Sequence, residues 1–324
     1  MTSRNVPAGT RRRISLVIPF YNEEPNVDNT LAAIDGVVDS QRYDWELVAV
    51  NDGSRDATLA KLHAASPANF ELIVVDLSRN FGKEAALSAG LSQASGDAVI
   101  PLDADLQDPP EMIAAMLEKW EEGFEVVLAR RSDRSSDGFL KRQSAAGFYR
   151  VMNRLSEVKI PDNVGDFRLM DRRVVEVVAS LPESRRFMKG LFAWAGFRTT
   201  SIDYVRPERE FGETKFSGWK LWNLAVEGIT SFSTAPLKIW TYVGILVALA
   251  SFGYGAFIIL RTAIQGIDVP GYASLLTVML FMSGLQLIGL GVIGEYLGRV
   301  YLESKRRPPF VIRSVQSRGG KASE

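Results

Sequence analysis

Short apolar runs alternate with helical patterns over the first 130 residues. Val27, Leu31, Ile34 and Val38 recur at helical spacing, as in a helix that crosses over a parallel sheet. Five runs rich in β-branched residues are typical of buried strands, and they cover residues 14–18, 46–50, 71–75, 98–102 and 125–129. The pattern predicts an α/β fold of the doubly wound, Rossmann-like type with a mostly parallel sheet.

The pattern changes towards the C-terminus, where two long apolar stretches follow each other. Residues 237–260 contain one charged residue, Lys238, and residues 272–293 contain none. At 1.5 Å per residue the first stretch would form a helix of about 36 Å, longer than the roughly 30 Å hydrocarbon core of a bilayer. We therefore expect two transmembrane helices, with two core helices of a larger soluble domain as the alternative.

The charges that flank these stretches predict a topology. The link between them carries Arg261 and Asp268, whereas the segment after the second is rich in basic residues: Arg299, Lys305, Arg306, Arg307 and Arg313. By the positive-inside rule, residues 294–324 form a cytoplasmic tail, and two spans return the chain to the side of its N-terminal domain. Both termini and the large domain are then expected on the cytoplasmic face of a bacterial inner membrane.

Two further segments have patterns of their own. Residues 1–13 are polar, include three consecutive arginines and lack the apolar core of a secretory signal, so we expect a flexible tail. Residues 216–236 place Trp219, Trp222, Val226 and Ile229 among polar residues. This pattern predicts an interfacial amphipathic helix, or alternatively a helix packed on the large domain.

Composition limits the chemistry that the chain can perform. There is no cysteine and only one histidine, His63, which falls in a predicted surface helix. Disulfides, thiolate nucleophiles, Ser-His-Asp triads and multi-histidine metal sites are thereby excluded. Lys plus Arg and Asp plus Glu number 38 each, so no global field favours nucleic acid as a partner.

Polar residues follow each of the five predicted strands. In an open parallel sheet, ligands bind outside the carboxyl ends of the strands, so these groups are expected to converge on one crevice. They are Pro19, Tyr21, Asn22 and Glu23, then Asn51 and Asp52, Arg79 and Asn80, Asp103 and Asp105, and Arg130 and Arg131.

The most specific of these segments is residues 103–111, Asp-Ala-Asp-Leu-Gln-Asp-Pro-Pro-Glu. Asp103 and Asp105 are separated by one residue at a strand end, so both carboxylates can point into the same space. Such hard oxygen ligands suit Mg²⁺ or Mn²⁺ bridging a diphosphate, and the cation would stabilise the charge that develops on a departing phosphate.

Several segments together resemble glycosyltransferase family 2. They include residues 17–24 (VIPFYNEE), 51–56 (NDGSRD), 79–84 (RNFGKE), 103–111, 165–170 (GDFRLM), 186–190 (RFMKG), 206–209 (RPER) and 212–215 (GETK). More narrowly, the chain is similar to polyisoprenyl-phosphate glycosyltransferases such as bactoprenol glucosyltransferase, dolichol-phosphate mannose synthase and the aminoarabinose lipid-carrier transferase. The resemblance covers nearly the whole chain, including the paired apolar stretches.

This resemblance implies a GT-A catalytic domain over residues 14–215 and an inverting sugar transfer from a nucleotide sugar to polyprenyl phosphate. UDP-glucose is the leading donor, with UDP-N-acetylglucosamine and GDP-mannose as alternatives. A membrane-anchored nucleotide-binding scaffold without turnover is the alternative from another class, and assembly into a homo-oligomer is compatible with the sequence.

The resemblance also implies roles for individual residues on the donor side. Asn51 stands where many relatives have Asp. The nucleotide is expected to contact Pro19, Tyr21, Glu23, Asp52, Lys83 and Asp103, and the metal is expected to contact Asp103, Asp105 and Gln107.

On the acceptor side, basic residues are expected to hold a phosphate that is already largely anionic near neutral pH. Asp166 is expected to have a catalytic role, in which it orients Arg168, hydrogen-bonds a sugar hydroxyl or accepts a proton. The alternative is a structural pair between Asp166 and Arg168 or another arginine. The expected phosphate contacts are Arg130, Arg134, Arg206 and Arg209, and the expected catalytic group comprises Asp166, Arg168, Asp105, Arg209 and Lys215.

Overall fold

The computed structural model describes residues 11–131, 164–181, 183, 188–204, 235–265 and 271–318. Its contacts divide the chain into two compact units. The first comprises Met1–Arg150, Val158–Phe216 and Arg307–Glu324, and the second comprises Val151–Glu157 and Ser217–Arg306.

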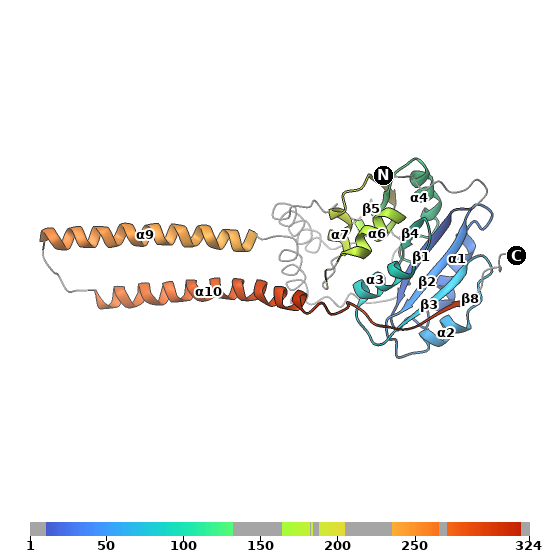
Figure 1. Ribbon diagram of the computed structural model, residues 1–324, viewed down its shortest axis with the longest axis horizontal. Helices are drawn as coiled ribbons and strands as arrows, with labels where there is room; N and C mark the ends of the chain where they lie inside the picture. The colour runs from blue at the N-terminus through green and yellow to red at the C-terminus, as the bar shows by residue number, and fades with distance from the viewer. Residues whose placement is uncertain are drawn as a thin grey trace. The chain divides into compact units, whose positions relative to one another are not determined.

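An eight-stranded sheet forms the centre of the first unit, in the order β7-β5-β6-β4-β1-β2-β3-β8 (Figure 1). β1 pairs in parallel with β2 and β4, β2 with β3, and β5 with β7, whereas β6 and β8 run antiparallel to their neighbours. The bounds are β1 Arg13–Phe20, β2 Asp44–Asn51, β3 Glu71–Leu77, β4 Ala98–Pro101, β5 Val126–Arg131, β6 Val164–Asp171, β7 Thr199–Tyr204 and β8 Ile312–Arg318. The five predicted strands correspond to β1–β5, and the mostly parallel sheet is confirmed.

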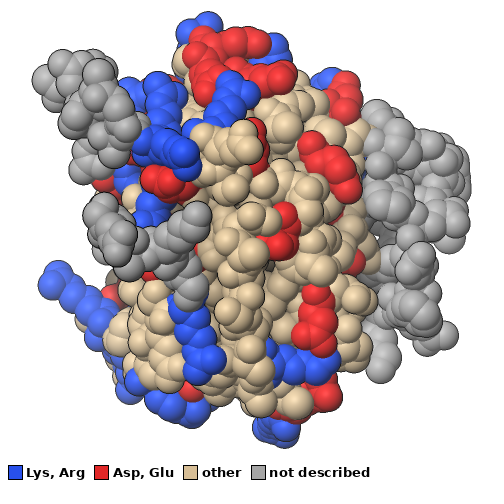
Figure 2. All heavy atoms as spheres, turned by 90° about the vertical axis from the view of Figure 1, so that its right-hand side faces the viewer, with Lys and Arg blue, Asp and Glu red and all other residues tan. Residues whose placement is uncertain are grey.

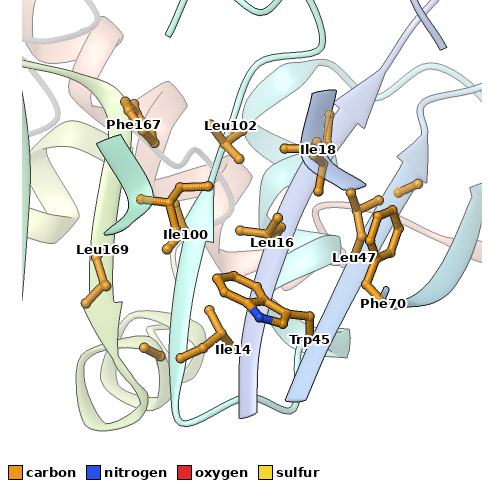
Figure 3. Close-up of a cluster of buried hydrophobic side chains, with 14 of the residues drawn as sticks. Ile14, Leu16, Ile18, Trp45, Leu47, Phe70, Ile100, Leu102, Phe167 and Leu169 are labelled. Atoms are coloured by element: carbon orange, nitrogen blue, oxygen red, sulfur yellow. The ribbon is translucent and has the colours of Figure 1, made fainter. Parts of the chain in front are cut away.

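One face of this sheet packs against a large apolar cluster. Ile14, Leu16 and Ile18 alternate along β1 and join Trp45, Leu47 and Phe70 in it (Figure 3). Side chains of α1 (Val27–Val37) and α4 (Met112–Glu121) complete the cluster from outside the sheet. The apolar spacing of the predicted crossover helix is thus the buried side of α1.

The opposite face is covered by α3 (Lys83–Gln93), with α6 (Arg172–Ser180) against α3 and α7 (Met188–Trp194) against α6. Gly90 of α3 lies so close to the sheet that a Cβ there would be 2.3 Å from Cγ1 of Val17. The Val17 side chain points away from the cluster around Ile14, Leu16 and Ile18 because neighbouring residues of a strand face opposite sides of the sheet. The close approach holds α3, and with it Lys83 at its first turn, against β1. A shorter helix, α2 (Thr58–Ala64), contains His63 as expected and contacts β2 and β3.

The second unit contains two long helices, α9 (Ala235–Gln265) and α10 (Tyr272–Ser304), which contact each other. Both are long and apolar enough to cross a membrane, with candidate spans at Ile239–Ile258 and Phe281–Ser304. The second was predicted to end at residue 293, but α10 continues to Ser304. Its 33 residues correspond to about 50 Å, so the helix is longer than a bilayer core.

The expected cytoplasmic tail at residues 294–324 therefore has more regular structure than its polar sequence indicated. Its first part continues α10, and Ile312–Arg318 forms β8 beside β3. The interfacial helix expected at residues 216–236 lies outside the described residues, apart from two residues that begin α9. On the molecular face drawn in Figure 2, basic and acidic side chains are interspersed.

Candidate active site

The loops that follow β1 and β2 are bound to each other by reciprocal hydrogen bonds. The backbone N–H of Asn22 donates to Oγ of Ser54 at 3.0 Å, and the N–H of Arg55 donates to Oδ1 of Asn22 at 2.9 Å. Asn22 has a φ of 53°, in the left-handed region that asparagine tolerates better than most residues. The predicted convergence of these two strand ends is therefore present.

Asp52 connects the same loops to the one that follows β3. Its Oδ1 accepts the N–H of Phe81 at 2.7 Å, and its Oδ2 accepts the N–H of Gly82 at 2.9 Å. Gly53, with a φ of 64°, packs so closely on this loop that a Cβ would lie 2.4 Å from the carbonyl carbon of Arg79. Burial raises the pKa of Asp52, and the two backbone N–H groups oppose that rise. In this structure Asp52 fixes the loop that leads into Lys83.

The other predicted nucleotide contacts lie around the same loops. Pro19 is the second-to-last residue of β1, and Tyr21, just after the strand, is 44% exposed. The N–H of Glu23 donates to Oγ1 of Thr58 at 3.0 Å, and Oε2 of Glu23 accepts from Asn26 at 2.6 Å. An exposed aromatic ring beside a crevice can stack on a nucleobase.

The predicted metal loop follows β4 in a tight conformation. Leu106 has a φ of 51°, and the N–H of Gln107 donates to Oδ1 of Asp105 at 3.2 Å. Oε1 of Gln107 is buried without a hydrogen-bond partner in the described part of the chain. A buried amide oxygen without a donor, close in sequence to Asp103 and Asp105, is the kind of ligand that a hard cation accepts.

Among the described residues, no group of three or more His, Cys, Asp or Glu side chains is positioned to hold a metal ion. The predicted metal residues Asp103, Asp105 and Gln107 include only two side chains of these types, so they do not form a group of this size by themselves.

Lys83 connects this loop to Asp166. Its Nζ lies 2.6 Å from Oδ1 of Asp103 and 2.8 Å from Oδ2 of Asp166. Burial raises the pKa of Asp103, and the Lys83 ammonium counteracts the rise. For Lys83 burial acts against the charge, but the two carboxylates prevail and raise its pKa. The three groups form one charged cluster from α3, the β4 loop and β6.

Asp166 lies near the carboxyl ends of the parallel strands because β6 is antiparallel. Its first residues lie beside the carboxyl ends of the parallel strands, with Val164 paired to Arg130. Arg168, two residues on, is buried: its Nη2 donates to the carbonyl of Gly165 at 2.6 Å, and its guanidinium lies 4.3 Å from the ring centroid of Phe192. Burial lowers the pKa of Arg168 to about 10, so it stays protonated at neutral pH. Arg168 thus supports the backbone beside Asp166, and Lys83 is an ion-pair partner of Asp166.

Arg130 and Arg131 end β5 on opposite faces. Arg130, predicted to hold the acceptor phosphate, forms a two-point exposed ion pair with Asp203 in this structure, at 2.6 and 2.9 Å. Arg131 turns inward, where its Nε donates to the Tyr204 hydroxyl at 3.2 Å and its Nη2 would lie 3.7 Å from a Cβ at Gly165. Strand alternation therefore brings Arg131 to Tyr204 and Gly165, on the face of β5 opposite to Arg130.

A comparison with protein families agrees with this arrangement. The family model for glycosyl transferase family 2 matches residues 15–178, half of the chain. The chain belongs to glycosyl transferase family 2. A second model, the GtrB C-terminal hairpin, matches residues 235–300, which include α9 and most of α10.

Individual proteins extend the match to nearly the whole chain. A prophage bactoprenol glucosyl transferase homolog from Escherichia coli K12 is 52% identical over 304 residues, which are 94% of this chain and 99% of that protein. The bactoprenol glucosyl transferase of Shigella phage SfV is 52% identical over 306 residues, 94% of this chain and 100% of its own. Among solved structures, glucosyl-3-phosphoglycerate synthase from Mycobacterium tuberculosis matches with a TM-score of 0.48 at 21% identity, covering 68% of this chain and 78% of its own.

For this family 2 glycosyltransferase, the sequence did not single out Tyr204, which supports the predicted metal loop. The buried Tyr204 donates a short hydrogen bond to Oδ1 of Asp108, and Nη2 of Arg131 lies 3.9 Å from the same oxygen. Asp108 belongs to the predicted metal-binding segment, residues 103–111, but only the register of β7 beside β5 brings Tyr204 to it. Four of the predicted residues, Arg134, Arg206, Arg209 and Lys215, lie outside the described residues.

Proposed function

We propose that this protein transfers glucose from UDP-glucose to a polyprenyl phosphate at the cytoplasmic face of a membrane. The observation that carries the proposal is the 52% identity, over nearly the full length of both chains, to proteins named bactoprenol glucosyl transferases. The charged cluster at the ends of the strands and the two long apolar helices provide the parts that such a reaction needs.

The donor binds along the loops after β1, β2 and β3 in this proposal. The ring of Tyr21 is exposed for stacking, and Asp52 holds the loop that presents Lys83. Lys83 and the Asp103 loop then face the diphosphate. An ammonium group at this position attracts the phosphate oxygens and neutralises part of their charge.

Asp103, Asp105 and Gln107 are the residues that would hold Mg²⁺ or Mn²⁺. Two carboxylates and the Gln107 oxygen, which has no hydrogen-bond partner among the described residues, suit a hard divalent cation. When bound, such an ion stabilises the negative charge of the leaving diphosphate by electrostatics. The positive φ of Leu106 and the hydrogen bond from the N–H of Gln107 to Asp105 fold this loop tightly.

The acceptor phosphate is the nucleophile. Phosphate monoesters have a second pKa of about 6, so the acceptor is largely a dianion at neutral pH and needs little help from a base. One of its oxygens bonds to the anomeric carbon while the bond from that carbon to the diphosphate oxygen breaks. The configuration inverts, and the nucleoside diphosphate leaves with the electron pair. Arg131 is placed to bind this phosphate beside Gly165.

In this proposal Asp166 is a positioning residue for Lys83. A free carboxylate next to an anionic nucleophile would repel it, but the Lys83 ammonium at 2.8 Å offsets that charge. Asp166 then orients Lys83 and can accept a hydrogen bond from a sugar hydroxyl. A strong general base is unnecessary for an acceptor that is already ionised.

A transfer assay tests the proposal and its alternatives. Detergent-solubilised full-length protein is incubated with polyprenyl phosphate, Mg²⁺ or Mn²⁺, and labelled UDP-glucose, UDP-N-acetylglucosamine or GDP-mannose in separate reactions. We expect label in a glycolipid from UDP-glucose, and loss of most of it in Asp105→Asn or in chelator. Transfer only from another donor would replace the assigned sugar. No label from any donor, with nucleotide binding intact, would favour a binding scaffold.

We also propose that α9 and α10 both cross the membrane, which returns the chain to its starting side. Since β8 follows α10 and belongs to the same sheet as β1–β4, the catalytic unit contains chain from before and after the helices. The absence of native cysteine makes labelling unambiguous. In intact cells an impermeant maleimide should label Asp268→Cys in the link between the helices and spare Ser201→Cys on β7; the reverse would contradict the topology.

A further inference from the structure

The last strand of the chain lies against the edge of the donor-binding half of the sheet. β8 pairs antiparallel with β3, with Ser314 opposite Asp76 and Ile312 opposite Leu77 (Figure 1). The N–H of Ser78, just after β3, donates to the carbonyl of Val311 at 2.9 Å. The pairing therefore continues to the point where the β3–α3 loop begins.

Arg313 makes two hydrogen bonds across this edge. Its Nη1 donates to Oδ2 of Asp76 at 2.9 Å, and its Nη2 donates to the carbonyl of Ser78 at 2.8 Å. The Asp76 carboxylate is almost fully buried, whereas the Arg313 side chain remains 59% exposed. One guanidinium thus holds both the last part of β3 and the first residue of the loop.

Asp76 in turn is hydrogen-bonded to the neighbouring strand β2. Its Oδ1 accepts a hydrogen bond from Nδ2 of Asn51 at 2.7 Å, and Asn51 is buried at the end of β2. Asn51 is followed by Asp52, whose carboxylate binds the N–H groups of Phe81 and Gly82. Arg313 therefore supports both partners of that interaction: the β2 end through Asp76 and Asn51, and the β3–α3 loop through Ser78.

We propose that Arg313 is a positioning residue for the donor site. It acts from the C-terminal strand to hold the Asp52 carboxylate and the loop leading to Lys83 in register. Because β8 follows α10 in the chain, the segment that leaves the candidate membrane span also completes the nucleotide-binding half of the enzyme. The inference rests on the proposed function only in assigning these loops to the nucleotide.

The alternative is that β8 merely covers the sheet edge, with Arg313 as one of several equivalent surface contacts. Arg318 provides the matched control, because it is an arginine on the same strand that also binds a backbone carbonyl, that of His63 in α2. That contact leads to α2 and not to the Asp52 loop. Edge covering alone predicts similar consequences for Arg313→Gln and Arg318→Gln.

The experiment compares Arg313→Gln, Arg313→Lys and Arg318→Gln in the full-length protein in detergent. We expect Arg313→Gln to weaken binding of UDP with Mn²⁺ about tenfold, the effect of losing one hydrogen bond to a charged group. The KM for UDP-glucose should rise by a similar factor, while the KM for polyprenyl phosphate stays within twofold. Arg313→Lys should recover part of the loss, because Lys keeps the charge opposite Asp76 but lacks the guanidinium fork.

Amide hydrogen exchange gives a readout that needs no turnover. Exchange in residues 78–83 should accelerate in Arg313→Gln and remain at the wild-type rate in Arg318→Gln. Equal exchange in the two variants would overturn the inference, as would equal losses towards donor and lipid. If the wild type transfers no glucose, the proposed function fails, but the exchange comparison still decides whether Arg313 positions the loop.

Discussion

Lys83 Nζ lies 2.8 Å from Oδ2 of Asp166, which joins the first residue of α3 to the start of an antiparallel strand. The same ammonium is 2.6 Å from Oδ1 of Asp103 in the predicted metal-binding segment. Two carboxylates that would otherwise repel each other are thus held by one cation. Such a cation is placed to exchange a carboxylate for a diphosphate oxygen when the donor enters.

Replacing Lys83 by methionine should therefore impair the chemical step more than the fold. The variant keeps the aliphatic stem but leaves Asp103 and Asp166 without their shared cation. We expect kcat/KM for the donor to fall about a hundredfold, the usual effect of removing one preorganised electrostatic contact. Steady-state kinetics of glycolipid formation provide the measurement. Lys119→Met, which removes an exposed pairing with Glu122, is the control and should keep wild-type kinetics.

Arg131 and Arg130 should behave differently although they are neighbours. Arg131→Gln removes the guanidinium beside Gly165 and should raise the KM for polyprenyl phosphate at least tenfold. Arg130→Gln breaks only an exposed pair with Asp203 and should leave both KM values within about threefold. A larger effect of Arg130 on the lipid KM would show that the site lies on the other face of β5.

Asn51→Asp should make stability depend on pH. The new carboxylate would face Asp76 at the position where Asn51 now donates a hydrogen bond. Two buried carboxylates share a proton, so the pKa of one is raised, and the stability gained from that proton is lost as the pH rises. We expect a destabilisation of about 1–3 kcal/mol near pH 8 that is smaller at pH 5.5. Thermal unfolding at the two pH values tests this, with the exposed Asn80→Asp as the control.

Tyr204→Phe should reveal the link between β7 and the metal loop. Burial and then the hydrogen bond to Asp108 raise the pKa of Tyr204 to about 12. The unfolded value is about 10, so the stabilisation is fully present below pH 10 and is lost between pH 10 and about 12. Wild type should therefore lose thermal stability over this range more steeply than Tyr204→Phe.

Turnover near pH 7 separates this effect from a purely structural one. Tyr204→Phe should lower turnover, because Asp108 in the predicted metal-binding segment loses the hydrogen bond from the Tyr204 hydroxyl. Tyr43→Phe removes another phenol whose pKa is raised to about 12, but that hydroxyl bonds Glu121 at the end of α4. Tyr43→Phe should change alkaline stability and leave turnover intact; equal turnover in both variants would contradict a role for Tyr204.

Strands β1–β5 could be predicted because buried strands contain short local runs of apolar residues. The run from Leu47 to Val50 is apolar and buried on both sides of the sheet, and each predicted run lies within or overlaps a strand. β6, β7 and β8 were not predicted. β6 mixes Asp166, Arg168 and Asp171 with apolar residues, and β7 and β8 are mostly polar, so their pairing partners make them strands.

The site could be predicted as a set of strand ends but not as a set of facing side chains. Arg130 and Arg131 are equivalent in a sequence, and only the alternation of β5 and the position of β7 separate them. Lys83 was correctly placed in the motif after β3, but its contact with Asp166 depends on an antiparallel strand that no local pattern indicated. None of the alternatives that the sequence left open for Asp166 included Lys83 as its partner.

The pairing of β8 with β3 also protects the sheet from unwanted association. β3 is otherwise the last strand on its side, and its backbone N–H and C=O groups would face solvent in a row. Exposed edges of this kind recruit strands from other molecules. A chain that ended before Ile312 would retain most of its catalytic residues, yet it would be prone to aggregate through that bare edge.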